Sequence, residues 1–264
     1  MTSLDLEGRL RRHRDSGRKL LVPYITGGLT GWVDAVRAAA ASGADAIEIG
    51  IPFSDPVMDG PVIQQASQAA LGAGATPVSI LQEVRSVDVD VPLVVMCYYN
   101  TVHHAGHERF AAQLSEAGIS GAIVPDLPLE ESDPWCRAAD EASIATVMLA
   151  APTAPDDRLP RVCARARGFV YSVGLLGVTG ERDALASTAT ELAGRLKAVT
   201  DRPVVVGVGV SNAAQAVEAC RVADGVVQGA SVVRRLMDGG PDAVADYVAE
   251  VRQALDENFV TSIS

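Results

Sequence analysis

Short runs of apolar residues alternate along the chain with longer segments whose apolar positions recur every three or four residues. The short runs lie at residues 20–25, 46–50, 93–98, 121–126, 146–151, 169–174, 204–209 and 225–229. Their length and their content of Val, Leu and Ile are typical of parallel strands that are buried on both faces. The intervening segments have helical periodicity, which is clearest in the last one, where one stripe holds Val244, Tyr247, Val248, Val251 and Leu255.

Eight alternations of strand and helix predict right-handed parallel crossovers that close into a (β/α)8 TIM barrel of the α/β class. A helix at about residues 4–16 would precede the first strand and could cover the barrel floor, and a short turn or helix near residues 232–236 would follow the eighth strand. A doubly wound open sheet is the alternative. It usually has fewer strands and a glycine fingerprint after the first strand, whereas residues 26–29 read TGGL. We therefore expect a single barrel domain over residues 1–264.

Composition argues against several kinds of partner and against a metal site. The 264 residues are 48% hydrophobic and carry a net charge of −11, which argues against nucleic acid or an anionic membrane surface as a partner. The first 19 residues are too charged for a secretory signal, and no apolar run approaches the roughly 20 residues of a membrane span, so a cytoplasmic location is expected. The scattered cysteines form no CxxC pair and predict buried, reduced thiols rather than a metal site; they are Cys97, Cys136, Cys163 and Cys220.

One carboxylate stands inside a predicted strand. Barrel active sites lie at the carboxyl ends of the strands. Strand alternation places Ile47 and Ile49 toward the helices and leaves Glu48 pointing into the barrel. A buried carboxylate is costly unless it is paired, protonated or functional, so Glu48 is either a salt-bridged core residue or a general acid/base. Its place near the strand end favours an acid/base with a raised pKa.

Other polar candidates lie in the loops after the strands. Residues 52–61 read PFSDPVMDGP, a constrained turn in which Asp55 and Asp59 are either turn formers or a second carboxylate that complements Glu48. Asp126 ends the fourth strand and could be catalytic, a structural cap or an interface residue. A loop with His103, His104 and His107 lacks the spacing of a helix-borne metal pair, which favours solvated side chains.

Glycine-rich sequence follows the last two predicted strands. Residues 206–211 read VGVGVS and residues 227–231 read VQGAS, each leading into a helix. Barrels commonly hold phosphate with these two loops and the N-terminus of an extra helix. Backbone N–H groups can bind an anion in spite of the negative net charge. A third loop, LGVTG at residues 176–180, could close as a lid.

The motifs together resemble those of tryptophan synthase alpha chains. The clearest is EIGIPFSDP at residues 48–56 followed by DGP at 59–61. The similarity extends over nearly the whole chain, with VPYIT at 22–26, YYN at 98–100, PDLP at 125–128, GVTG at 177–180 and GVG at 207–209. The resemblance implies retro-aldol cleavage of indole-3-glycerol phosphate into indole and glyceraldehyde 3-phosphate.

The resemblance also implies roles for individual residues. Glu48 would be the main acid/base, and Asp59 would bind the indole N–H and stabilise the protonated ring. Thr179 would help to order Asp59 when its loop closes. The indole slot would be formed by Tyr24, Met96, Ile123, Leu149 and Val208, with Tyr171 beside Glu48. Backbone amides of four residues would bind the phosphate: Gly180, Gly209, Gly229 and Ala230.

Two positions of the predicted site depart from the family pattern. Ala230 stands where a serine is common, with Ser231 one place on, and Val208 stands where many relatives carry Phe. The backbone donor at residue 230 is kept, and Val208 would loosen the indole slot. Neither departure removes a catalytic carboxylate.

The family assignment implies a partner as well. Members dock on a beta chain that carries pyridoxal phosphate, in an alpha2-beta2 assembly through which indole passes, so no cofactor and no metal are expected in this chain. Docking would use the mouth loops, including residues 52–59 and the region of Asp126. A stand-alone indole-3-glycerol phosphate lyase is one alternative. A non-catalytic barrel that activates a partner is another, against which the presence of both Glu48 and Asp59 argues.

Overall fold

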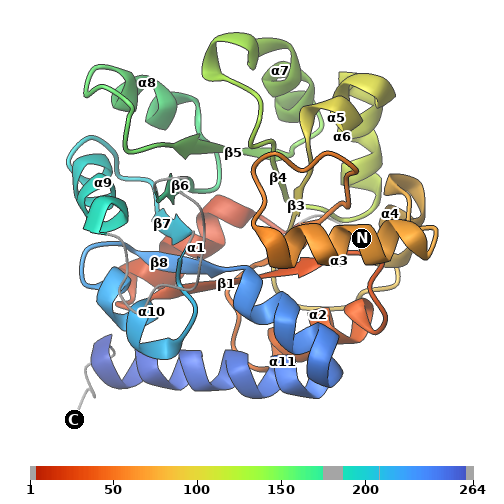
Figure 1. The fold of residues 1–264 in the computed structure, drawn as a ribbon. Coiled ribbons are helices and arrows are strands. Elements are labelled where there is room, and N and C mark those ends of the chain that lie inside the picture. Colours follow the sequence, from red (N-terminus) through yellow and green to blue (C-terminus); the bar gives the residue numbers. More distant parts are fainter. Residues whose placement is uncertain (1–3, 175–186, 208, 260–264) are drawn as a thin grey trace.

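The computed structural model describes residues 4–174, 187–207 and 209–259. Eight parallel strands close into a barrel in which each strand pairs with the next and β8 returns to β1 (Figure 1). The strands are β1 Leu20–Thr26, β2 Ile47–Gly50, β3 Leu93–Met96, β4 Gly121–Ile123, β5 Ala145–Ala150, β6 Val170–Val173, β7 Val204–Gly207 and β8 Gly225–Gln228. The predicted (β/α)8 architecture is confirmed.

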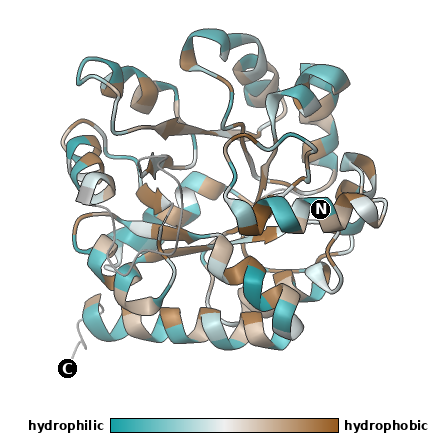
Figure 2. Ribbon diagram, viewed as in Figure 1, coloured by the Kyte–Doolittle hydropathy of each residue, from teal (hydrophilic) through white to brown (hydrophobic). Residues whose placement is uncertain are grey.

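Helices surround the barrel, and Figure 2 shows hydrophobic strands in the interior with hydrophilic residues along the outer helices. The helices are α1 Leu6–Asp15, α2 Trp32–Ala41, α3 Pro61–Gly72, α4 Pro77–Val84, α5 Tyr99–Ala105, α6 His107–Glu116, η1 Leu129–Glu131, α7 Asp133–Glu141, α8 Arg158–Arg165, α9 Ser187–Lys197, α10 Ala213–Cys220 and α11 Ala230–Phe259. No helix within the described ranges is long and apolar enough to cross a membrane. The four cysteines are buried and free, as predicted.

Several predicted boundaries change in the structure. The ladders of β3 and β4 end before Tyr98 and Asp126, because Tyr98 is the N-cap of α5 and Asp126 accepts the backbone N–H of Tyr99. The histidines do not share one loop, since two lie in α5 and His107 begins α6. In the described part of the chain, no group of three or more His, Cys, Asp or Glu side chains could hold a metal ion.

The helix after β8 is longer than predicted. It begins at Ala230 and continues to Phe259 across a break at Gly240, whose φ of 72° and ψ of −165° are not helical. Glycine tolerates this positive φ, and Pro241 then starts the second segment. The apolar stripe predicted for the C-terminal segment, from Val244 to Leu255, is buried as expected.

The first helix covers the floor of the barrel, as the sequence predicted. Leu6 and Leu10 of α1 are buried. Leu6 lies against Gly121, which begins β4, and against Gly168, just before β6. A Cβ atom at these glycines would come within 2.9 and 2.6 Å of a Leu6 methyl group. Close packing of this kind leaves no room for larger residues, so α1 seals the end opposite the predicted active site.

An ion-pair network links α1, β1 and α11 near the same end. Its centre is the fully buried Asp45, which is bonded to His13 Nδ1 at 2.7 Å, Arg18 Nε at 2.7 Å, the Leu21 N–H at 2.9 Å and Arg252 Nη1 at 3.2 Å. Burial raises the pKa of Asp45, but the bonds to His13 and Arg18 outweigh burial and leave the pKa below its ordinary value. The network is structural, because it lies at the N-terminal ends of the strands.

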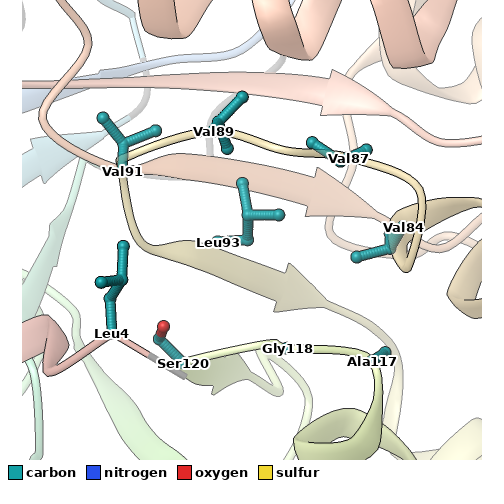
Figure 3. A pocket seen from close by; sticks show the side chains of 9 residues that line it. All are labelled: Leu4, Val84, Val87, Val89, Val91, Leu93, Ala117, Gly118 and Ser120. Carbon is teal, nitrogen blue, oxygen red and sulfur yellow. The ribbon is translucent and has the colours of Figure 1, made fainter. Parts of the chain in front are cut away.

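A small apolar cavity lies between the starts of β3 and β4, where Figure 3 shows it close to Leu4. It measures about 30 Å³ and is lined by Leu4, Val84, Val87, Val89, Val91, Leu93, Ala117, Gly118 and Ser120. A site of about 30 Å³ has room for only a few atoms, so it cannot hold a substrate. Among the described residues the buried Ser120 hydroxyl has no hydrogen-bond partner.

Candidate active site

Glu48 lies on β2 and points into the barrel, as strand alternation predicted. Its neighbours Ile47 and Ile49 are fully buried, and its ladder partner is Tyr24 on β1. Glu48 is only 3% exposed, and its Oε2 atom has no hydrogen-bond partner among the described residues. Burial, with a smaller contribution from the charge of Asp59, raises the pKa of Glu48 to about 8. A carboxyl group in this setting keeps its proton at neutral pH.

The second carboxylate, Asp59, lies in the loop between β2 and α3. A backbone bond to Pro56 O at 3.1 Å closes the turn before it, and Gln64 Nε2 donates to its carbonyl at 2.8 Å. Burial raises the pKa of Asp59 to about 6, while the nearby Tyr98 hydroxyl lowers it. Asp55 in the same loop is exposed and bonded to the Ser54 hydroxyl at 2.6 Å. Asp55 therefore fits a turn former, whereas Asp59 faces the barrel mouth.

Two tyrosines flank the carboxylates, each lying over a glycine of a neighbouring strand. A Cβ atom at Gly50 would come within 1.9 Å of the Tyr24 hydroxyl, and one at Gly207 within 2.2 Å of Tyr171. Burial, together with the nearby charges of Asp59 and Glu48, raises the pKa of both phenols. Both hydroxyl groups are therefore neutral hydrogen-bonding groups inside the site.

The predicted indole-slot residues on the strands lie on the inner face. Register pairs Gly50 with Met96, Met96 with Ile123, and Leu149 with Tyr171. Paired residues of parallel strands point to the same side of the sheet, so these side chains line the same interior as Glu48. Met96 and Ile123 are buried and Leu149 is half-buried. Val208 lies outside the described residues.

The structure also places part of the predicted phosphate site. Gly209, after β7, has a φ of 91° that favours glycine, and it is exposed. Gly229 accepts the N–H groups of Val232 and Val233, both at 3.0 Å, and so begins α11, whose first residue, Ala230, is exposed. The amides that precede these bonds, at the very start of a helix, have no partner within the helix, which makes this end a suitable anion site. Gly180 and Thr179 lie outside the described residues.

One contact in the site was not predicted from the sequence. The Tyr98 hydroxyl accepts the N–H of Met58 at 2.9 Å, and its ring stacks on Phe53 with a centroid separation of 5.1 Å. The only signal for it in the sequence was an aromatic residue at the end of the third apolar run. Asp126 accepts the N–H of Tyr99 at 2.8 Å. Of the three roles considered for Asp126, this bond fits the structural cap.

Comparison with known proteins gives one consistent family. The family model described as tryptophan synthase alpha chain matches residues 10–260. The tryptophan synthase alpha chain of Thermobifida fusca is 45% identical over 259 residues, which cover 93% of this chain and 96% of that protein. The alpha chain of Streptomyces coelicolor is 44% identical over 243 residues, 90% of each chain.

Solved structures agree with the sequence matches. A tryptophan synthase from M. tuberculosis, in a form with aminoacrylate and BRD0059 bound, has a TM-score of 0.87 at 35% identity and covers 96% of this chain and 98% of that one. The tryptophan synthase subunit alpha of Legionella pneumophila also has a TM-score of 0.87, at 29% identity, with 97% and 99% of the two chains covered. The likeness therefore extends over the whole barrel.

Proposed function

The chain belongs to the tryptophan synthase alpha chain family, and on that basis we propose which of its residues perform the reaction. It is a lyase of tryptophan biosynthesis (EC 4.2.1.20) that cleaves indole-3-glycerol phosphate to indole and glyceraldehyde 3-phosphate. We also propose that residues 1–264 form a single domain.

Glu48 is the proton donor in this proposal. Indole is a poor leaving group as a carbanion, so its C3 atom must be protonated before the carbon–carbon bond can break. The observation that carries the assignment is the burial of Glu48 without a hydrogen-bond partner among the described residues, which raises its pKa to about 8. A group with that pKa holds a proton at neutral pH and can give it up to a basic carbon placed over it.

Asp59 stabilises the charge that this protonation creates. The protonated ring carries a positive charge at its nitrogen, and an ionised carboxylate that accepts the indole N–H lowers the energy of that state. With a pKa of about 6, Asp59 is ionised at neutral pH, unlike Glu48. The two carboxyl groups therefore have different roles in one site.

In this proposal Glu48 carries out both proton transfers of the reaction. After giving its proton to C3, the Glu48 carboxylate takes the proton of the glycerol hydroxyl next to the scissile bond. The hydroxyl oxygen becomes the aldehyde oxygen, and the bonding electrons return to the indole ring. Indole and glyceraldehyde 3-phosphate leave with Glu48 protonated again, so no other proton carrier is needed.

The remaining residues bind the two ends of the substrate. The indole ring contacts Tyr24, Met96, Ile123, Leu149 and Val208, with Tyr171 beside Glu48. The phosphate binds to the amides of Gly209, Gly229 and Ala230 at the start of α11 and to Gly180. Thr179 belongs to the loop that closes over the substrate and orders Asp59. For the residues on described strands and helices, the support is their shared position at the barrel mouth.

The partner in this proposal is a tryptophan synthase beta chain. The family normally works as a complex with it, and the beta chain carries the pyridoxal phosphate. We place the docking surface on the mouth loops, residues 52–59 and the region of Asp126, in an alpha2-beta2 assembly. Val57, at the tip of the first loop, is 80% exposed, and burial against a partner would remove this apolar side chain from water.

The central experiment is indole release by a Glu48→Gln variant. Glutamine keeps the shape but cannot donate a carboxyl proton, so turnover should fall by at least about 10²-fold. The matched control is Glu83→Gln, on the outer helix α4, where an amide can still accept the Trp32 indole N–H. Circular dichroism checks the fold of both variants. Turnover of Glu48→Gln equal to that of the control would refute the mechanism.

A second experiment compares the chain alone with the chain plus a beta subunit. Slow indole release that rises sharply on addition of the beta subunit supports the synthase-subunit function. Rapid release by the chain alone supports the stand-alone lyase. Absence of release in both conditions, in enzyme with native circular dichroism, excludes catalysis by this barrel.

A further inference from the structure

We propose that Tyr98 is a positioning residue for the cleavage reaction, and that its hydroxyl holds the Asp59 carboxylate in place at the barrel mouth. The inference rests on the proposed role of Asp59. Tyr98 follows β3, whereas Glu48 lies on β2 and Asp59 lies in the loop after β2.

The backbone of Tyr98 is itself held firmly. It follows β3 and caps the N-terminus of α5 with a φ of −74° and a ψ of 149°. The next N–H, that of Tyr99, is bonded to Asp126 at 2.8 Å. Strand, helix cap and Asp126 together fix the point from which the phenol ring extends, so its hydroxyl has little freedom to follow a moving loop.

Tyr98 contacts the Asp59 loop at both of its ends. Near the loop's start, its ring stacks on Phe53 with an interplanar angle of 25°. Near the end, its hydroxyl oxygen accepts the N–H of Met58, the residue directly before Asp59, at 2.9 Å. A phenol that accepts through a lone pair keeps its own proton, which is available to the neighbouring Asp59 carboxylate.

These contacts have a chemical consequence for Asp59. Burial favours the neutral form of this carboxyl group, while the Tyr98 hydroxyl beside it favours the ionised form and lowers its pKa. Only the ionised form can stabilise a positive indole ring. The Tyr98 hydroxyl therefore controls both the direction of the carboxylate and the fraction of enzyme molecules in which it is charged.

The test is a Tyr98→Phe variant, which keeps the stacked ring and removes only the hydroxyl. We expect kcat to fall about tenfold, as loss of one hydrogen bond to a charged group predicts. We also expect the acid limb of the kcat profile to move up by about one pH unit, since Asp59 would ionise later. A change confined to ring packing would leave the acid limb where it is.

The matched control is Tyr99→Phe. Its hydroxyl contacts His107 Nε2 at 3.0 Å, away from the Asp59 loop, so its kcat and acid limb should stay at wild-type values. A Tyr98→Phe profile that coincides with the Tyr99→Phe profile overturns the inference. Loss of native circular dichroism in Tyr98→Phe also overturns it, because the proposal limits the hydroxyl's effect to one loop.

A double variant separates this inference from the proposed function. With Asp59→Asn already present, Tyr98→Phe should reduce kcat less than twofold further, because the group it positions is gone. A further tenfold loss would contradict a role through Asp59. Wild-type activity in Asp59→Asn alone would refute the proposed role of Asp59, whereas an inactive Asp59→Asn with a normal Tyr98→Phe would refute only the inference about Tyr98.

Discussion

Glu48 and Asp59 lie in the same barrel mouth, yet their surroundings hold them in different protonation states. Glu48 has no hydrogen-bond partner for its Oε2 atom among the described residues and has a pKa of about 8. Burial raises the pKa of Asp59 to about 6, and the nearby Tyr98 hydroxyl lowers it. Between these values one group is an acid and the other an anion, which is the combination that the cleavage requires.

This difference predicts a bell-shaped dependence of kcat/KM on pH. Activity should fall below about pH 6 as Asp59 gains a proton and above about pH 8 as Glu48 loses one. Asp59→Asn removes a neighbouring negative charge and should lower the pKa of Glu48. A ¹³C NMR titration of the Glu48 carboxyl group measures it, with Asp88→Asn, on an exposed loop, as the control. An unchanged Glu48 pKa in Asp59→Asn would contradict the charge coupling.

Glu48 should also make stability depend on pH. Its ordinary pKa of 4.5 is raised to about 8 on folding, so between these values the folded state binds a proton that the unfolded state has lost. Folding stability should therefore decrease as pH rises through this window, by up to about 1.4 kcal/mol per pH unit, and Glu48→Gln should remove the decrease. Urea denaturation at pH 5, 6.5 and 8 measures both proteins. Parallel curves would show that the Glu48 pKa is not raised.

Sequence patterns could identify Glu48 but not the residues that adjust the pKa values of the site. Strand alternation depends only on local geometry, so the inward direction of Glu48 follows from its two isoleucine neighbours. The hydrogen bond from the Met58 N–H to the Tyr98 hydroxyl joins loops 40 positions apart, and no periodicity encodes it. The ion pair between Asp45 and Arg252 also joins residues far apart in the sequence, so the local pattern could not predict it. The roles of the site residues remain predictions.

At the scale of elements, the start of α11 combines an exposed helix end with a glycine before it. The helix begins at Ala230 directly after β8, so its free amides face the end of the barrel where Glu48 lies. Partial positive charge at a helix N-terminus favours an anion. The phosphate proposal can therefore be tested by putting a competing negative charge on the helix.

An Ala230→Asp variant should have opposite effects on folding and on substrate binding. A carboxylate in the first turn of a helix stabilises it by about 0.3–1 kcal/mol, but here it should repel the phosphate and raise KM at least about tenfold. Val78→Asp, at an exposed position in the first turn of α4, is the control with the same charge change. Tm and KM report the two effects. An unchanged KM in Ala230→Asp would place the phosphate elsewhere.

The ends of strands could not be predicted from the local hydrophobic pattern alone. The third and fourth apolar runs extend to residues 98 and 126, but β3 and β4 end at Met96 and Ile123. Each apolar run continues past the hydrogen-bonded part of its strand, because residues at the barrel mouth remain apolar. These residues contact a neighbouring loop or cap a helix instead of pairing with the next strand. The order, type and number of the strands were all predicted correctly, since each depends on the runs themselves.

The cavity beside β4 predicts a stabilising substitution. Ser120 is buried, and its hydroxyl has no hydrogen-bond partner among the described residues, so that its desolvation is uncompensated. Ser120→Ala should raise the free energy of unfolding by about 1 kcal/mol, because it removes an unpaired polar group. Ser132→Ala is the control, since that buried hydroxyl donates to the Leu129 carbonyl at 2.8 Å and its loss should destabilise. A loss of stability in Ser120→Ala would reveal a partner for that hydroxyl.

On the scale of the whole molecule, stability and chemistry occupy opposite ends of the barrel. The floor has close packing and buried ion pairs, whereas the mouth has the exposed Gly209 and the Glu48 carboxyl group, whose Oε2 atom has no partner among the described residues. Loops at the mouth can vary without loss of the core, as is general for this architecture. Substitutions at the two ends should therefore affect different measurements.

Leu6→Ala tests this separation from the floor side. The side chain is 2% exposed and fills the space beside two glycines, so its truncation should lower the free energy of unfolding by about 2–5 kcal/mol. The kcat of the folded enzyme should not change, because the carboxylates lie at the other end. Urea denaturation and turnover at a temperature well below Tm measure the two quantities. A large fall in kcat would show that the ends are coupled.

Closure of the barrel also sets an order of events during synthesis. Leu20 and Leu21 of β1 pair with Gly225 and Val226 of β8, and Arg252 completes the Asp45 network. At translation rates of about 5–20 residues per second, the first strand must wait about 10–40 s for its last neighbour to be made. Throughout that interval one edge of β1 is exposed in the nascent chain. β1 can be fully paired only once β8 has been made, and until then its open edge is where a chaperone would have the most to protect.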